Sequence, residues 1–158
     1  MTWLSSAAHH RWLEAETDRL LEFGRAATLR TGGFGWLDDH GAPDLDRPTQ
    51  LWLTCRMTYV FALGTLLGRP GFGPLVDHGL AALTDRFHDV EHGGWFAAVE
   101  PTDAGGPAGG DGAVKGAYPH AFVVLATASA AAAGRPGARE PLDQALEVSG
   151  GHFWDEAA

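Results

Sequence analysis

Basic residues are scarce in this sequence, and the shortage argues against two classes of partner. The 158 residues include 11 lysines and arginines against 20 aspartates and glutamates, so the formal net charge is −9 at pH 7 with neutral histidines. Nucleic-acid binding needs clustered cations that neutralise phosphates, and adsorption to an anionic membrane needs them too. We therefore predict neither a nucleic acid nor a membrane as a partner. The acidic residues are spread along the chain, which is typical of a soluble surface rather than a cation site.

Cysteine and long apolar runs are also lacking. Cys55 is the single cysteine, so no intramolecular disulfide is possible, and its apolar neighbours predict a small buried hydrophobe rather than a nucleophile. No stretch approaches the roughly 20 apolar residues that a membrane span needs. The N-terminal residues do not have the basic region and apolar region of a signal peptide. We expect a cytoplasmic location.

The sequence does contain helical periodicity, in five segments of two alternating kinds. Amphipathic patterns, typical of surface helices, cover residues 7–28 and 74–88 and a last segment that begins near Ala138 and weakens at Ser149-Gly150-Gly151. Two other segments, 48–67 and 118–133, are apolar nearly all round, which predicts buried helices. The first of these opens with Pro48, a favoured residue at the first helical position.

This alternation of exposed and buried helices predicts an all-α fold with two concentric layers, a toroid or solenoid of helical hairpins. An internal repeat supports the prediction. The sequence LGRPG at Leu67–Gly71 recurs as AGRPG at Ala133–Gly137, and each copy follows an apolar segment and precedes an amphipathic one. A Gly-Gly-aromatic sequence also recurs, ending at Phe34 and at Trp95. We predict that residues 1–158 form part of a single domain, its N-terminal part.

Arg56 is the most informative residue for function, because it is the only charged residue between Arg47 and Arg69. An unpaired buried guanidinium costs several kcal/mol, so Arg56 either pairs with a buried carboxylate or faces a solvated cavity. Trp52 and Tyr59 fall on the same face of the predicted helix. A Trp, an Arg and a Tyr around a cavity suit a polyol, whereas the structural alternative is an arginine that bridges helices beside a core tryptophan.

The repeat adds three candidates from the second apolar helix and its approach. The offset that relates the two Gly-Arg-Pro-Gly sequences also places Tyr118 on Trp52, so two inner helices present an aromatic ring at the same level. His120 lies in the first turn of its helix, where the positive helix end lowers the pKa of an imidazole. It is a candidate base or, alternatively, a core histidine. Lys115 is a candidate pocket residue or a solvated loop lysine.

One metal-binding pattern is present but does not predict a metal site. Residues His88 to His92 fit the H-x-x-E-H pattern of inverted zinc peptidases. They fall where the third helix is expected to end, directly before Gly93-Gly94. Two histidines need a continuing helix to bind one zinc ion, and no third ligand is evident. We therefore predict no metal.

Six segments follow one another in an order that resembles a known family. The chain is similar to the N-terminal portion of the sugar isomerases in the N-acylglucosamine 2-epimerase superfamily, and the resemblance covers essentially the whole chain. The segments are AHHRWLEAETDRLLEFGR, GGFGWLDDHG, LWLTCRMTYVFALGTLLGRPG, LVDHGLAAL, DVEHGGWFAAV and KGAYPHAFVVLATASAAAAGRPGA.

This resemblance implies an (α/α)6 barrel with a central sugar pocket, of which the chain holds about two and a half hairpins. It implies an aldose–ketose isomerase that needs no metal or organic cofactor and moves a proton between C2 and C1 through a cis-enediol. Arg56 falls on the family's pocket arginine, Tyr118 on a pocket tyrosine and Trp52 on an aromatic lining position. None of the eight histidines matches the family's catalytic pair, so we predict that the isolated chain is inactive.

Two other hypotheses stay open at the level of sequence. The chain is a carbohydrate-binding or regulatory half-barrel that self-associates through its exposed inner face, or it is a helical scaffold whose apolar face docks another protein. The carbohydrate-binding hypothesis and the isomerase interpretation both predict a monosaccharide as the small-molecule partner.

Overall fold

A computed structural model of the protein describes residues 3–102 and 105–154. Its α-helices are α1 (Ala7–Gly24), α2 (Leu51–Leu66), α3 (Gly73–Ala82), α4 (Ala117–Ala132) and α5 (Arg139–His152). Single turns of 3-10 helix cover Trp3–Ser5, Arg25–Ala27 and Gly110–Ala113, and a π-helical turn, Leu83–Phe87, extends α3. The strands β1 (Thr49–Gln50) and β2 (Ala98–Val99) pair antiparallel, with Thr49 opposite Val99.

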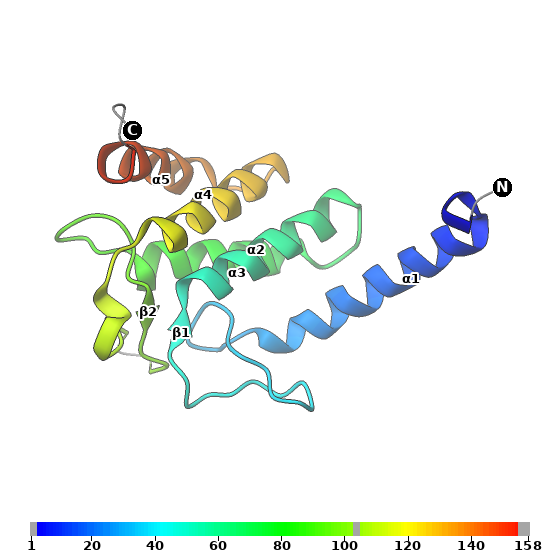
Figure 1. Ribbon diagram of the computed structural model, residues 1–158, viewed down its shortest axis with the longest axis horizontal. Helices are drawn as coiled ribbons and strands as arrows, with labels where there is room; N and C mark the ends of the chain where they lie inside the picture. The colour runs from blue at the N-terminus through cyan, green and yellow to red at the C-terminus, as the bar shows by residue number, and fades with distance from the viewer. Residues whose placement is uncertain (1–2, 103–104, 155–158) are drawn as a thin grey trace.

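The two apolar helices pack against each other, and amphipathic helices cover them. In Figure 1, α2 and α4 lie side by side, α3 lies along α2, and α5 lies along α4. The prediction of a helix-rich fold is therefore confirmed, whereas α2 and α4 are each buried along one face only, although the sequence pattern predicts helices that are buried nearly all round. The long helix α1 makes much less contact with α2 and extends away from the rest of the molecule.

The Gly-Arg-Pro-Gly repeat corresponds to two turns of the same geometry. Gly68 and Gly134 have φ angles of 72° and 68°, a left-handed conformation that favours glycine. The next residue closes each turn: the N–H of Arg69 donates to the Gly64 carbonyl and that of Arg135 to the Ala130 carbonyl, both at 3.0 Å. The guanidinium of each arginine then pairs with an outer helix, Arg69 with Asp18 of α1 and Arg135 with Asp77 of α3.

The Gly-Gly-aromatic repeat also has one structure in both copies. Phe34 and Trp95 are 0% and 1% exposed, and each forms an antiparallel bridge, with Thr28 and His88 respectively. The backbone N–H of Phe34 donates to Thr54 Oγ1 and that of Trp95 to His120 Nε2, both at 3.2 Å. Thr54 and His120 are related by the same offset as Gly68 and Gly134, so the inner helix of each repeat holds its aromatic segment from the same position.

Three of the predicted helix ends are wrong. Pro48 does not open a helix, because Thr49 and Gln50 form β1 and α2 begins at Leu51. The first helix changes to 3-10 geometry after Gly24. The last helix does not weaken at Ser149 but continues through Gly150 and Gly151 to His152. Among the described helices, none combines the length and apolarity that crossing a membrane requires.

Candidate functional site

The candidate site is built around Arg56, on the surface where α2 and α4 meet. The Arg56 Nη2 group donates a hydrogen bond of 3.2 Å to the hydroxyl of Tyr118. The guanidinium carbon lies 5.0 Å from the ring centroid of Trp52 and 4.6 Å from that of Phe122. Both are cation–π distances. Arg56 is therefore held by two rings and one hydroxyl.

Helical spacing explains how these four residues meet. Trp52 and Arg56 are one helical turn apart on α2, and Tyr118 and Phe122 are one turn apart on α4, so each pair shares a helix face. The rings of Tyr118 and Phe122 contact each other edge to face at 5.0 Å. Because α2 and α4 pack side by side, the two faces form one surface. The structure thus brings together Trp52, Arg56 and Tyr118, as predicted from the sequence.

This surface is exposed, so within the described chain Arg56 neither pairs with a buried carboxylate nor lines the enclosed cavity that the sequence analysis predicted. The Tyr118 side chain is 62% exposed, and Arg56 is also exposed. Among the described residues, the contacts of Arg56 are with the hydroxyl and the two rings, and none of them is with a carboxylate. Arg56 does link two helices, as the structural alternative supposed. Its remaining N–H groups still face solvent and are available to a ligand.

The arrangement can bind a molecule that has hydroxyl groups and apolar C–H faces. A guanidinium offers up to five N–H donors in a rigid plane, and a phenol can donate or accept. Aromatic rings bind apolar faces. Trp36 extends the aromatic surface, since its ring meets Trp52 edge to face at 5.4 Å. Tyr59 is half-buried on α2, one turn beyond Arg56.

Two residues that sequence reasoning did not select belong to this surface, Phe122 and Trp36. Phe122 has a signal in the sequence, because the offset of the repeat that relates Gly68 to Gly134 also relates Arg56 to Phe122. Trp36 has no such signal. Its place depends on the path of the chain between α1 and α2.

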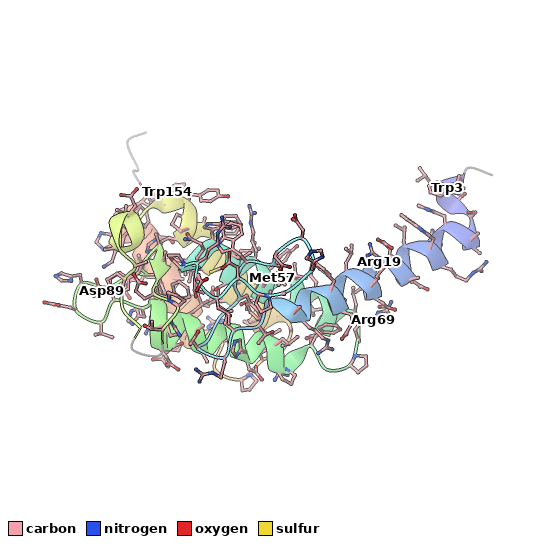
Figure 2. All side chains as sticks on the ribbon, turned by 90° about the horizontal axis from the view of Figure 1, so that it is seen from below. Trp3, Arg19, Met57, Arg69, Asp89 and Trp154 are labelled. Carbon is pink, nitrogen blue, oxygen red and sulfur yellow. The ribbon has the colours of Figure 1, made fainter. Side chains whose placement is uncertain are left out.

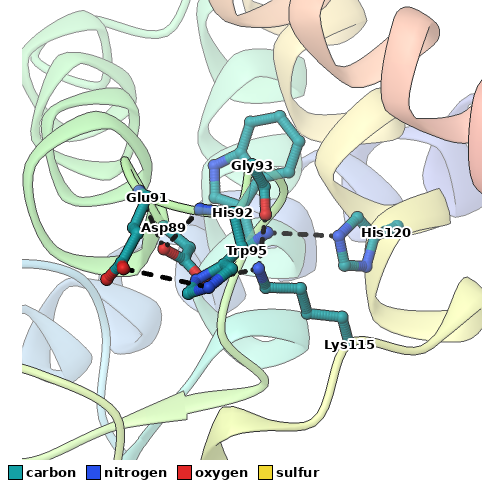
Figure 3. Close-up of polar contacts among 7 residues, drawn as sticks. All are labelled: Asp89, Glu91, His92, Gly93, Trp95, Lys115 and His120. Carbon is teal, nitrogen blue, oxygen red and sulfur yellow. Dashed lines mark hydrogen bonds and ion pairs between the residues drawn. The ribbon is translucent and has the colours of Figure 1, made fainter.

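Lys115 lies in a second cluster, with Asp89 and Gly93 (Figure 3). Its Nζ group is 2.6 Å from Asp89 Oδ2 and donates a 2.5 Å hydrogen bond to the carbonyl of Gly93. Asp89 also accepts from the backbone N–H groups of Glu91 and His92. The hydrogen bond from Lys115 holds the pKa of the Asp89 carboxyl far below its usual range. The charges of Lys115 and Asp89 thus stabilise the loop before Trp95.

His120 lies in the same cluster and is 1% exposed. Its Nε2 atom accepts from the N–H of Trp95, and Nδ1 lies 2.8 Å from the Gly116 carbonyl, so both ring nitrogens are engaged when Nδ1 carries the proton. The pKa of His120 is lowered, as predicted, but burial is the main cause, with smaller contributions from Lys115 and His152. These contacts match the alternative of a core histidine that supports the backbone.

The H-x-x-E-H residues do not form a helical pair. His88 forms the bridge to Trp95, and His92 lies in the following turn, 3.4 Å from Asp89. Across the residues that the structure describes, no group of three or more His, Cys, Asp or Glu side chains is placed to hold a metal ion.

The comparisons with known proteins agree on one family. The sequence profile described as N-acylglucosamine 2-epimerase matches residues 32–158. The chain is 49% identical over 154 residues to a D-mannose isomerase of Thermobifida fusca and 45% identical over 159 residues to a D-mannose isomerase of Pseudomonas cannabina pv. alisalensis. Each alignment covers 98% of this chain but only 37% and 36% of the relative, so the chain spans little more than a third of their length.

Solved structures give the same picture of the fold. A crystal structure of D-mannose isomerase aligns with a TM-score of 0.80 and 21% identity, over 99% of this chain and 38% of that one. The cellobiose 2-epimerase of Spirochaeta thermophila aligns with a TM-score of 0.74 and 25% identity, over 94% of this chain and 37% of that one.

Proposed function

The chain belongs to the N-acylglucosamine 2-epimerase family, and on that basis we propose that it forms the substrate-binding part of a sugar isomerase of the aldose–ketose type. The substrate is a monosaccharide of the D-mannose class, which is converted to its 2-ketose. The observation that carries the proposal is the contact of Arg56 with Trp52, Phe122 and Tyr118 on an open surface.

In this reaction a base removes the proton from C2 and returns it to C1, through a cis-enediol. Negative charge develops on the oxygen of the enediolate, and a fixed guanidinium stabilises such charge without rearrangement. We assign this role to Arg56, with Trp52 against the C–H face of the sugar and Tyr118 and Tyr59 at its hydroxyls. Lys115 and His120, which the sequence offered as pocket residues, are instead assigned a structural role, because their contacts fix the turn before Trp95.

The proton-transfer histidines are proposed to lie outside this chain. His120 is a poor base, because its Nε2 atom already accepts a hydrogen bond and its ring is buried. The first test is an assay of the isolated chain with D-mannose. We expect no D-fructose, and turnover by the pure chain would refute this part of the proposal.

The role of Arg56 is tested in a chimera in which this chain replaces the matched stretch of the T. fusca relative. We expect Arg56→Lys to lower kcat/KM by about 10²- to 10³-fold, as the loss of one oxyanion donor does, because lysine cannot keep the planar stacked geometry. Arg139→Lys is the control, since Arg139 lies on α5, is 81% exposed and pairs with Asp143 on the same helix. Equal losses in both variants would contradict a specific role for Arg56.

A further inference from the structure

The segment Gly33–Trp36 connects the core of the molecule to the proposed sugar site. In Figures 1 and 2, α1 runs from Trp3, far from the body of the molecule, to the body itself, where this segment follows. At the inner end of the segment, Phe34 is fully buried. At its other end, the ring of Trp36 meets that of Trp52 edge to face at 5.4 Å. The position of Trp36 at the site therefore depends on how the segment is held.

Two side chains hold the buried end of the segment, one from each neighbouring helix. Thr54 of α2 accepts a hydrogen bond of 3.2 Å from the N–H of Phe34. His78 of α3 places its Nε2 atom 3.0 Å from the carbonyl oxygen of Gly33, and because a carbonyl only accepts, Nε2 is the donor. The rings of His78 and Phe34 also meet edge to face, with their centroids 5.5 Å apart. His78 thus contacts the segment through both a hydrogen bond and its ring.

The hydrogen bond from His78 is additional to those that the backbone already makes. The Gly33 carbonyl also accepts the backbone N–H of Leu29 at 3.0 Å, which closes the turn before Phe34. Gly33 lies close to α2, because an added Cβ atom would be 2.9 Å from Thr54 Oγ1. The backbone bonds of this turn are complete without His78, so the histidine restricts the segment further.

The second copy of the repeat provides an internal comparison. There the Gly94 carbonyl accepts the N–H of Asp89 at 2.9 Å, which is the equivalent of the bond from Leu29. The offset between the two Gly-Arg-Pro-Gly turns places Gln144 of α5 where α3 has His78. Across the residues that the structure describes, no hydrogen bond joins Gln144 to this carbonyl. The additional bond from an outer helix therefore belongs to the first copy.

The two copies also differ in what the segment carries. The offset between the two Gly-Gly-aromatic sequences places Ala97 where the first copy has Trp36. A methyl group offers little surface to a ligand, whereas an indole offers a broad apolar face. Ala97 supports the backbone instead, since its carbonyl accepts the N–H of Leu51 at the start of α2. The additional bond thus occurs in the copy whose segment ends in a tryptophan beside Trp52.

We propose that His78 is a positioning residue of the sugar site, which acts through Gly33 on Trp36. Trp36 is then a second aromatic wall, and it contacts the sugar beside Trp52. The planes of the two indoles meet at 76°, so they form a corner into which the C–H groups of a hexose can pack. This inference rests on the proposed function, and it adds a residue to the surface that selects the substrate. His78 itself acts through the backbone, without contact with the sugar.

Trp36 has other supports, which lie on the loop that follows it. The guanidinium carbon of Arg47 lies 5.2 Å from the Trp36 ring centroid, and the Trp36 carbonyl accepts the N–H of Asp44 at 2.8 Å. These contacts fix Trp36 from the side of the loop, whereas His78 acts from the core. Loss of the His78 donor is therefore expected to loosen the position of Trp36 without unfolding the loop.

The first test needs no sugar. His78→Leu keeps an apolar side chain beside Phe34 but removes the donor, whereas His78→Gln keeps an N–H donor at a similar reach. In NMR spectra of the isolated chain, we expect the nuclear Overhauser contacts between the rings of Trp36 and Trp52 to weaken in His78→Leu and to return in His78→Gln. His40→Leu is the control, because His40 is an exposed histidine on the loop after Trp36.

The second test determines whether the position of Trp36 matters to the substrate. In the chimera described above, we expect Trp36→Ala and His78→Leu each to raise KM for D-mannose by about 3- to 10-fold. We expect kcat to stay nearly unchanged, because the contact is equally strong in the ground state and the transition state. The double variant is expected to lose no more than Trp36→Ala alone, since the histidine acts through the tryptophan.

Three results would overturn the proposal. One is a His78→Leu variant with a lower Tm but unchanged contacts between Trp36 and Trp52, which would mean a purely structural role. Another is an equal loss of these contacts in His78→Leu and His40→Leu. The third is a KM that Trp36→Ala leaves unchanged, or additive losses in the double variant. A chimera with the natural sequence that does not convert D-mannose would instead refute the proposed function, and the ring contacts would still decide whether His78 positions Trp36.

Discussion

At the scale of single residues, the closest approach of two helices depends on Gly79 of α3. A Cβ atom at this position would lie 1.9 Å from Thr58 Oγ1, and Thr58 is fully buried on α2. Neither helix can move without disturbing the core around Phe61 and Val76. We predict that Gly79→Ala destabilises the protein by about 2 kcal/mol or more, measured by urea unfolding.

Gly150→Ala is the matched control for this prediction. Gly150 is also helical, but it is exposed, and an added Cβ atom would have nothing within 4 Å. Alanine favours the helix there, so we expect a gain in stability of about 0.5–1 kcal/mol. A Gly79→Ala variant as stable as Gly150→Ala would contradict the packing of α3 against α2.

The buried ring of His120 makes stability depend on pH. Burial lowers its pKa below the ordinary value of 6.5, so between the lowered pKa and 6.5 the unfolded chain binds the proton more readily than the folded one. The stability that the neutral His120 ring contributes to the free energy of unfolding is complete above pH 6.5, and it is lost as the pH falls through the pKa of the folded protein. We predict that His120→Gln loses less stability than the natural protein between pH 7.5 and pH 5.5, in urea titrations at both values. Equal losses would contradict the prediction.

The sequence alone could group side chains correctly where they lie on the same face of a helix. Trp52, Arg56 and Tyr118 could be grouped because helical spacing and the repeat relate them without knowledge of the loops. Lys115 and His120 could not be placed in the same way. Their partners, Asp89, Gly93 and the N–H of Trp95, lie in a turn whose path depends on tertiary packing.

At the scale of elements, the two Gly-Arg-Pro-Gly turns give a test of the repeat. Gly68 and Gly134 have nearly the same positive φ and no atom within 4 Å of an added Cβ. Alanine in this conformation costs about 1–2 kcal/mol. We therefore predict that Gly68→Ala and Gly134→Ala destabilise the protein by equal amounts within error, as measured by thermal unfolding. Clearly unequal costs would mean that the two turns are not equivalent.

The pattern of charge predicted the type of each helix better than its ends. The inner helices α2 and α4 could be recognised because they are almost uncharged, and the structure packs them together. The end at Pro48 was mispredicted because the pairing of β1 with β2 is a long-range contact. The π-helical turn after Ala82 has no local signal, and α5 continues through two glycines while packed along α4.

At the scale of the whole molecule, the all-α fold and the family could be inferred from the sequence, and the comparisons confirm the family. The closed ring of six hairpins stays a prediction, because this chain spans only about 37% of its relatives. An exposed apolar face was predicted from the sequence, but not that α1 would carry part of it, because the position of α1 relative to α2 depends on tertiary packing.

The most direct test of the central claim is a titration of the labelled protein with D-mannose, followed by NMR. Six tryptophans give indole signals, and Trp52→Phe identifies the one at the site. We predict a saturable shift of the Trp52 signal that disappears in Arg56→Met, with the folded spectrum retained. Two results would contradict the assignment of a sugar to the Arg56 surface. One is a Trp52 signal that does not move, whether or not the signals near Lys115 and His120 move. The other is a Trp52 signal that moves equally in Arg56→Met.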